Sequence, residues 1–276
     1  MLGFLVTADG GSGLSYAQTR AKSLKAPTRG VRVPVDSSWM DQVRAVSLLL
    51  PDGAAFCHQT ALRIYGIDFG DEHPLHVTVP QGSNRGTRVV VAWHRSDVTR
   101  QRRRVKGVIV TTPWKTWCDL GGVLELPALV AVTDLLLRRG LLTRSELIVP
   151  KACRGAVNLR RAAELGDPRS NSVRESEIRV HMINRGLPPA DLNPNVYEDG
   201  GWVAVSDFVW WKYHCILEYD GEHHLTLDQK HQDEITRAAL RQAGWAVMAI
   251  DAKHYKRLSL TLAEIEEMLR SRGWRP

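Results

Sequence analysis

The feature that most constrains the fold is an apolar run that ends in closely spaced carboxylates. Residues 215–220 read Cys-Ile-Leu-Glu-Tyr-Asp, which suits a strand crossing a sheet, yet Glu218 and Asp220 stand two positions apart. On a strand these side chains share a face, with Cα atoms about 7 Å apart. Two anions at that spacing repel each other by about 2 kcal/mol at an effective dielectric constant of about 20, and a neighbouring Asp207 would add to this. The pattern therefore predicts a cation among these carboxylates.

Length and composition indicate a globular protein with a real core. The chain has 276 residues, of which 43% are hydrophobic and 24% are charged, so one large or two ordinary domains are expected. No apolar run approaches the roughly 20 residues that span a bilayer, and the first residues lack the basic leader of a signal peptide. The four cysteines form no CxxC pair and are interpreted as reduced core thiols: Cys57, Cys118, Cys153 and Cys215. We therefore expect a cytoplasmic protein that does not bind membranes.

The positive charge is confined to the first half of the chain. The net charge of the whole chain is +7, and residues 151–276 hold equal numbers of acids and bases, so the excess belongs to residues 1–150. Two basic runs carry much of it: Arg20, Lys22, Lys25, Arg29 and Arg32, and then Arg100, Arg102, Arg103, Arg104 and Lys106. Such clusters are typical of a nucleic-acid-binding surface, although either run alone could be a solvated surface.

The hydrophobic patterns predict two regions of mixed helices and strands. In the first, we expect helices at about 14–24, 39–50, 58–65 and 126–139, strands at 29–35, 75–79, 88–94 and 108–112, and a helix opened by a capping box at 143–146. A polar, turn-rich segment at 166–171 marks a boundary. Beyond it we expect helices at 172–185, 228–243 and 259–272, and strands at 195–198, 202–210, 214–220 and 245–250. This order predicts an α/β (α+β) fold with a mixed sheet flanked by helices.

Several motifs of the last third resemble a known nuclease domain. The stretches that carry the resemblance are Ser172-Val173-Arg174-Glu175-Ser176, Ser206-Asp207-Phe208, Glu218-Tyr219-Asp220-Gly221-Glu222-His223-His224 and Asp233…Arg237…Leu240…Ala243-Gly244-Trp245. They are similar to the very-short-patch-repair-like endonuclease domain, a branch of the PD-(D/E)XK superfamily. The resemblance implies a restriction-endonuclease-like domain at 166–276.

The first half resembles a second family, less specifically. Its motifs are Arg29-Gly30-Val31, His58-Gln59-Thr60-Ala61, His76-Val77-Thr78-Val79-Pro80 and Thr111-Thr112-Pro113. They are similar to a winged-helix antitoxin region of the abortive-infection type, found before such nuclease domains in actinobacterial proteins. The resemblance implies a basic, winged-helix-like module at 1–165. It also implies a protein partner in a toxin–antitoxin-like or defence system.

The nuclease resemblance implies a divalent metal site. Asp207 and Glu218 would be its ligands, Asp220 would join them or orient water, and Glu175 would be the acidic residue contributed by the preceding helix. Oxygen ligands without clustered thiols favour Mg²⁺ or Mn²⁺ over zinc. Such an ion polarises a phosphate and activates water.

One departure from the superfamily pattern bears on catalysis. The signature ends in lysine, and Asp220 stands at the corresponding position. His223 or His224 could then act as general acid or base, and Arg237 could supply the missing cation. Structural alternatives remain open, because Ser172 and Glu175 have capping-box spacing and Asp233 and Arg237 have the spacing of a surface ion pair.

The sequence thus favours a metal-dependent DNA endonuclease with a basic DNA-binding module. The proposed DNA contacts are Arg20, Lys22, Lys25, Arg29, Arg32, Arg102, Arg103, Arg104 and Lys106. The main alternative is a catalytically silent nuclease fold that acts as a DNA-binding, antitoxin-like regulator. A metal-binding structural domain is a third reading, which the basic runs weaken.

Overall fold

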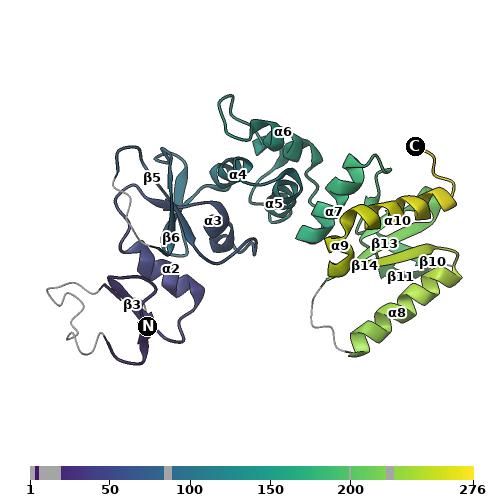
Figure 1. The fold of residues 1–276 in the computed structure, drawn as a ribbon, viewed down its shortest axis with the longest axis horizontal. Helices are drawn as coiled ribbons and strands as arrows, with labels where there is room; N and C mark the ends of the chain where they lie inside the picture. The colour runs from purple at the N-terminus through teal and green to yellow at the C-terminus, as the bar shows by residue number, and fades with distance from the viewer. Residues whose placement is uncertain (1–3, 6–19, 84–88, 199, 222–226) are drawn as a thin grey trace. The chain divides into compact units, whose positions relative to one another are not determined.

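The chain forms two compact units, each containing helices and sheets. The computed structural model describes residues 4–5, 20–83, 89–198, 200–221 and 227–276 (Figure 1). The first unit consists of Met1–Val123 and Ser145–Ala156, and the second of Leu124–Arg144 and Val157–Pro276. The expectation of a mixed α/β protein is confirmed. Within the described residues, no helix has the length and apolar character needed to cross a bilayer.

The first unit holds two sheets. A small antiparallel sheet has the order β1-β3-β2, and a five-stranded mixed sheet has the order β6-β5-β4-β8-β7. The strands are β1 (Phe4–Leu5), β2 (Leu24–Lys25), β3 (Val31–Pro34), β4 (Ala55–Phe56), β5 (Leu75–Val79), β6 (Val91–Arg95), β7 (Arg102–Val105) and β8 (Val108–Thr111). The helices are α2 (Trp39–Ser47), α3 (His58–Ile64) and α4 (Pro113–Gly121).

Local sequence signals explain where these helices begin. Ser38 caps α2 through a complete capping box with Asp41, and the Thr112 hydroxyl caps α4, which has Pro113 in its first turn. Buried side chains of α2 and α3 pack on the five-stranded sheet, so that Val43, Val46, Ala61, Ile64, Phe56 and Val77 share one core.

The second unit is built around a four-stranded mixed sheet. Its order is β14-β13-β12-β9, with β13 and β14 parallel and the other pairs antiparallel, and β10 and β11 form a separate hairpin. The strands are β9 (Asp191–Leu192), β10 (Asn195–Glu198), β11 (Gly201–Val205), β12 (Phe208–Trp210), β13 (Cys215–Asp220) and β14 (Ala246–Asp251). The helices are α5 (Leu126–Arg138), α6 (Ala156–Leu165), α7 (Val173–Asn184), α8 (Leu227–Gln242), α9 (Ala252–Lys256) and α10 (Leu258–Ser271).

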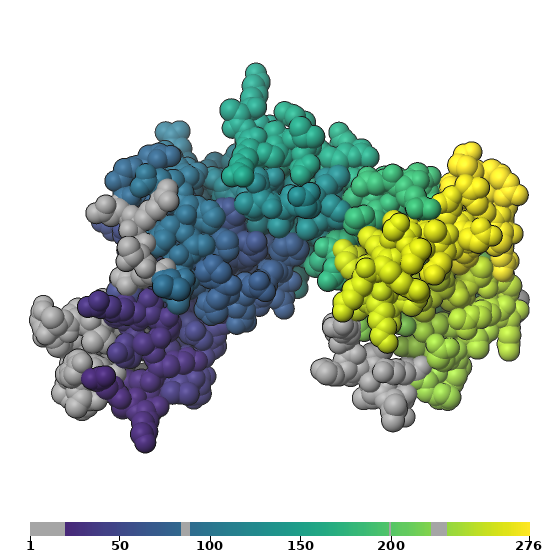
Figure 2. All heavy atoms as spheres, in the orientation of Figure 1, coloured from purple at the N-terminus to yellow at the C-terminus, as the bar shows by residue number. Residues whose placement is uncertain are grey.

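Strand alternation distributes the side chains of β13 between two cores. Cys215 and Leu217 pack with α7 and α10, whereas Ile216 packs with Leu240 of α8 and with the β10–β11 hairpin. Helix α10 covers its face of the sheet from outside and lies at the surface of the unit (yellow in Figure 2). Glu218 and Asp220 stand two and four positions after Ile216, so they lie on the same face of the sheet as Ile216, the face on which α8 packs.

Some expected elements differ from the observed ones. The capping-box pattern at 143–146 was predicted to open a helix but forms only a short 3-10 turn (Arg144–Glu146). Helices α4, α6 and α9 and the strands β1, β2, β4, β7 and β9 were not anticipated. The single strand expected at 202–210 is two strands, because the chain breaks at Ser206 and Asp207. The helix expected at 14–24 falls largely outside the described residues, and its last residue, Leu24, lies in strand β2. The boundary expected at 166 lies inside the second unit, where α5 packs against α7.

Candidate active site

The acidic residues singled out in the sequence lie on neighbouring elements of the second unit. Asp207 occupies the break between β11 and β12, Glu218 and Asp220 end β13, and Glu175 lies in the first turn of α7. Arg237 comes from α8. Strands β12 and β13 are paired so that Phe208 faces Leu217, which places Asp207 beside the end of β13. The sheet therefore gathers residues that are up to 62 positions apart in the chain.

Asp207 is a half-buried carboxylate in an electronegative setting. One of its oxygens, Oδ2, accepts a hydrogen bond of 2.7 Å from the backbone N–H of Tyr219. Burial raises the pKa of Asp207 to about 7, and the charge of Glu175, followed by those of Glu218 and Asp220, adds to this effect. The hydrogen bond from Tyr219 opposes the shift. A cation bound beside Asp207 would stabilise its ionised form, because it would offset both the cost of desolvating the charge and the repulsion from the neighbouring carboxylates.

Glu175 is buried and held by hydrogen bonds at the start of α7. Its Oε2 accepts from the backbone N–H of Asn171 (2.9 Å) and from Nδ2 of Asn193 (2.8 Å), and its own N–H donates to the Ser172 hydroxyl (3.1 Å). The carboxylate thus ties down the residue before the N-cap, whereas a reciprocal capping box would bring it to the N–H of Ser172. These contacts fix one oxygen of Glu175 near Asp207.

Arg237 is the positive charge that the acidic strand end requires. Its guanidinium is buried and donates to Glu218 Oε2 (2.8 Å), to Asp220 Oδ1 and to Glu234 Oε1 (2.9 Å). Burial alone would lower the pKa of Arg237, but the hydrogen bonds and charges of Glu218 and Asp220 outweigh it and raise that pKa. The simultaneous contact confirms that Glu218 and Asp220 share a face. The ion pair expected from spacing was with Asp233, but the helical partner is Glu234.

Asp207 lies between two cavities. One, of about 630 Å³, is lined by Glu175, Asp207 and residues of α9 that include Tyr255 and Lys256. The other, of about 420 Å³, is lined by Asp207, Glu218, Asp220, Arg237 and the β11 strand. Both are large enough to admit a phosphate group with its water. Asp207 and Tyr219 line both cavities, so a ligand in either cavity would meet these two residues.

Lys256 is a candidate that the sequence analysis missed. It ends α9, which follows directly on β14, and β14 is the parallel neighbour of β13 with Asp251 beside Asp220. Lys256 lines the same cavity as Glu175 and Asp207. The signal available in the sequence was a basic residue shortly after an apolar strand. It becomes informative only once that strand, β14, is known to pair with β13, the strand that carries Glu218 and Asp220.

The carboxylates suit a hard cation that retains water ligands. Glu218 and Asp220 already share Arg237, and among the described side chains Asp207, Glu218 and Asp220 do not form a set of three ligand atoms within 4.8 Å of one another. Mg²⁺ commonly takes only one or two carboxylates and completes its shell with water, so Asp207 with Glu175 or Glu218 fits such an ion. The described side chains do not form a site in which three carboxylates surround one ion.

The remaining predicted residues are placed only in part. His223 and His224 lie outside the described residues, so their predicted role in proton transfer stays a prediction. In the first unit, Arg102, Arg103 and Arg104 lie on β7, an edge strand of the five-stranded sheet, and Lys106 follows it. The earlier run lies on and around β2 and β3 of the small sheet: Arg20, Lys22, Lys25, Arg29 and Arg32. The two basic runs thus lie on different sheets.

Comparison with known proteins reveals mycobacterial relatives. No protein-family model matches the chain. Two proteins of Mycobacterium tuberculosis are similar to it, "Uncharacterized protein Rv2248" of strain H37Rv and "Uncharacterized protein MT2308" of strain CDC 1551. Each is 28% identical over 226 residues, which cover 80% of this chain and 83% of the relative. The similarity therefore extends over parts of both compact units.

Proposed function

We propose that the second unit is a metal-dependent endonuclease domain of restriction-endonuclease-like fold that hydrolyses phosphodiester bonds in DNA. The observation that carries the proposal is the position of Asp207, a half-buried carboxylate whose pKa is raised to about 7 and which forms part of two cavities. Buried acids with strongly shifted pKa values in cavities are typical of functional sites. Mg²⁺ or Mn²⁺, when bound, would polarise the phosphate and supply an activated water.

The protein's own residues would divide the work of binding and positioning. Asp207, with Glu175 or Glu218, would hold the cation, and the hydrogen bonds to Glu175 keep its carboxylate in place. Arg237 fixes the rotamers of Glu218 and Asp220 through its ion pairs. Lys256 would neutralise charge on a phosphate in the larger cavity, the task left open by Asp220 at the motif position. His223 or His224 would transfer the proton.

The first unit would bind the DNA backbone. We infer a winged-helix-like module in which exposed Arg103 and Arg104 of β7, together with the residues around β2 and β3, neutralise phosphates. Arg103 also donates a hydrogen bond of 3.0 Å to the Tyr65 hydroxyl, with its guanidinium carbon 4.9 Å from the ring centroid, and these contacts help to position the side chain.

A second function is favoured by one observation. Arg237 already pairs with both Glu218 and Asp220 and offsets part of their charge, and the motif lysine is missing, so the site needs less from a metal ion. The alternative is then a silent nuclease fold that acts as a DNA-binding, antitoxin-like regulator. In this alternative the protein binds DNA but does not cleave it.

A nicking assay separates the two functions. Supercoiled, nicked and mismatched DNA would be incubated with the full chain and Mg²⁺ or Mn²⁺, beside Asp207→Asn and a control, Glu267→Gln, that alters an exposed carboxylate of α10. The proposal expects cleavage by wild type and by the control, and little by Asp207→Asn. DNA binding without cleavage by wild type would favour the silent regulator. Equal cleavage by Asp207→Asn would exclude the assigned site.

A further inference from the structure

A second cluster of reactive side chains lies in the first unit, far in sequence from the acidic site. Ligand atoms of Cys57, His58 and His94 all lie within 4.8 Å of one another. Cys57 and His58 come from the junction of β4 and α3, and His94 comes from β6. The five-stranded sheet brings them together across 36 residues of sequence. Among the described residues this is the only such set of three His, Cys, Asp or Glu ligand atoms.

The backbone at this junction is locally unfavourable. His58, the first residue of α3, has a φ of 51°, a left-handed conformation that non-glycine residues seldom adopt. Cys57 occupies the N-cap position but makes no side-chain capping hydrogen bond. Ser, Thr, Asp or Asn at an N-cap would stabilise the helix by about 1 kcal/mol. The chain therefore forgoes local stability to direct a thiol and an imidazole toward the same point, as functional sites commonly do.

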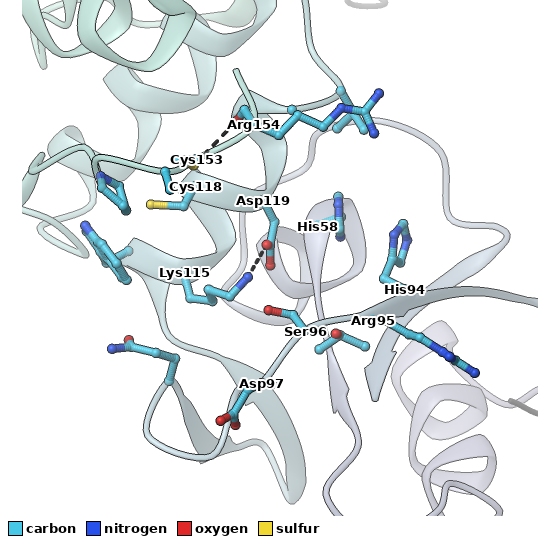
Figure 3. A pocket seen from close by; sticks show the side chains of 17 residues that line it. His58, His94, Arg95, Ser96, Asp97, Lys115, Cys118, Asp119, Cys153 and Arg154 are labelled. Atoms are coloured by element: carbon cyan, nitrogen blue, oxygen red, sulfur yellow. Dashed lines mark hydrogen bonds and ion pairs between the residues drawn. The ribbon is translucent and has the colours of Figure 1, made fainter. Parts of the chain in front are cut away.

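The histidines form a stacked group at the wall of a cavity. The rings of His58 and His94 are stacked with centroids 4.0 Å apart, and Nδ1 of His76 lies 2.9 Å from Nε2 of His94. Figure 3 shows His58 and His94 side by side at the wall of a cavity of about 590 Å³, whose lining also includes the ion pair of Lys115 and Asp119. Exposed Arg95 and Arg154 line the same cavity, which therefore reaches the surface.

We propose that Cys57, His58 and His94 bind a zinc ion, with the fourth coordination position facing this cavity. One thiolate and two imidazoles form a ligand set that suits zinc and does not suit Mg²⁺ or Mn²⁺. Cys57 is fully buried behind the cavity wall, and the two histidines belong to that wall, so the open position faces the solvent-filled side. The contact between His76 and His94 is the kind that orients a metal-binding imidazole.

Zinc binding requires two adjustments of the histidine rings. Zinc bonds of about 2.3 Å to sulfur and 2.0–2.1 Å to nitrogen place tetrahedral ligands about 3.6 Å apart. Cys57 Sγ and His58 Nδ1 are 3.1 Å apart, so the imidazole has to move back by roughly half an ångström. A metal ion also lies in the plane of each imidazole that binds it, so the rings of His58 and His94, stacked at 22° with centroids 4.0 Å apart, have to turn out of this stack to bind one ion.

A nucleophilic Cys57–His58 pair explains the arrangement less well. The thiol is completely buried and does not line the cavity, so a substrate in the cavity cannot reach it. A purely structural cluster of hydrogen-bonded core residues is the remaining alternative.

Metal content and cobalt spectroscopy test the proposal. The full chain, carrying an affinity tag without histidines, would be produced in zinc-supplemented medium and analysed for metals. We expect about one zinc per chain, and Co²⁺ replacing it should give a thiolate-to-cobalt charge-transfer band and the visible bands of a tetrahedral ion. Wild type that retains no zinc and develops no charge-transfer band overturns the proposal, and leaves the structural cluster as the explanation.

Matched variants locate the site. Cys57→Ser should abolish the charge-transfer band, and the milder His94→Gln should lower zinc occupancy and Co²⁺ affinity by at least 10-fold. Cys215→Ser, a change at a buried thiol of the second unit, should leave both unchanged. Asp207→Asn should also leave the cobalt spectrum unchanged, which separates this site from the acidic one. A charge-transfer band that persists in folded Cys57→Ser would overturn the assignment.

Discussion

The raised pKa of Asp207 predicts a specific pH dependence of stability. Below about pH 4 the carboxyl is protonated in both the folded and the unfolded chain and contributes no difference. As the pH rises from 3.8, the ordinary pKa, to about 7, the folded-state pKa, the unfolded state releases its proton first. The free energy of unfolding therefore falls across this window. At about 1.36 kcal/mol per pKa unit, the loss amounts to about 4 kcal/mol for the Asp207 carboxyl.

Asp207→Asn removes the ionisable group and keeps an oxygen that can accept from the N–H of Tyr219. We expect the variant to match wild type near pH 4 and to be more stable than wild type at pH 8 without divalent ions, by up to about 4 kcal/mol. Titrating groups that do not interact with Asp207 contribute equally to both proteins, so the difference reports on Asp207 and the carboxylates coupled to it. Hydrogen exchange of the β12 and β13 amides reports on this unit directly.

Divalent ions supply the second half of the test. A cation at roughly one hundred times its dissociation constant stabilises the folded state by about 2.7 kcal/mol. Mg²⁺ or Mn²⁺ should therefore recover much of the wild-type stability at pH 8 and have little effect on Asp207→Asn, with Glu267→Gln behaving like wild type. A stability difference that stays constant from pH 4 to pH 8 would refute the reasoning about burial and repulsion at Asp207.

Three further predictions concern other parts of the chain. Arg237→Met should lower the free energy of unfolding of the second unit by about 3–5 kcal/mol, because Glu218 and Asp220 lose their partner. The control Arg241→Met, at an exposed position of the same helix, should change it by less than about 0.5 kcal/mol. Equal effects of the two substitutions in chemical denaturation would contradict the role of Arg237. Lys256→Ala should reduce the rate of single-turnover cleavage by about 10²–10³-fold and leave the melting temperature unchanged. The control Lys253→Ala, on the same helix, should leave the cleavage rate unchanged. Equal cleavage rates in the two variants would exclude Lys256 from the site. Replacing Arg102, Arg103 and Arg104 with alanine should weaken duplex binding. The slope of log affinity against log salt concentration should become shallower by roughly 0.9 per lost phosphate contact. An unchanged slope in titrations at several salt concentrations would place these arginines on an ordinary solvated surface.

Sequence periodicity by itself determined most elements of the second unit. The apolar alternation of residues 215–220 predicted a strand with Glu218 and Asp220 on one face, and a single guanidinium does contact both. Ser172 predicted the start of α7, and Gly244 the end of α8. These signals are local, since caps, turn residues and alternation depend on neighbours a few positions away.

Tertiary structure alone decided which groups meet. Arg237 looked like half of a helical surface pair and is instead buried against the end of β13, because α8 packs on the face that carries Glu218 and Asp220. Lys256 becomes a site candidate only through the parallel pairing of β13 and β14. Cys57 and His94 had no shared pattern in sequence, and the adjacency of β4, β5 and β6 in the sheet places them together. Contacts of this kind depend on strand order and helix placement, which no local periodicity encodes.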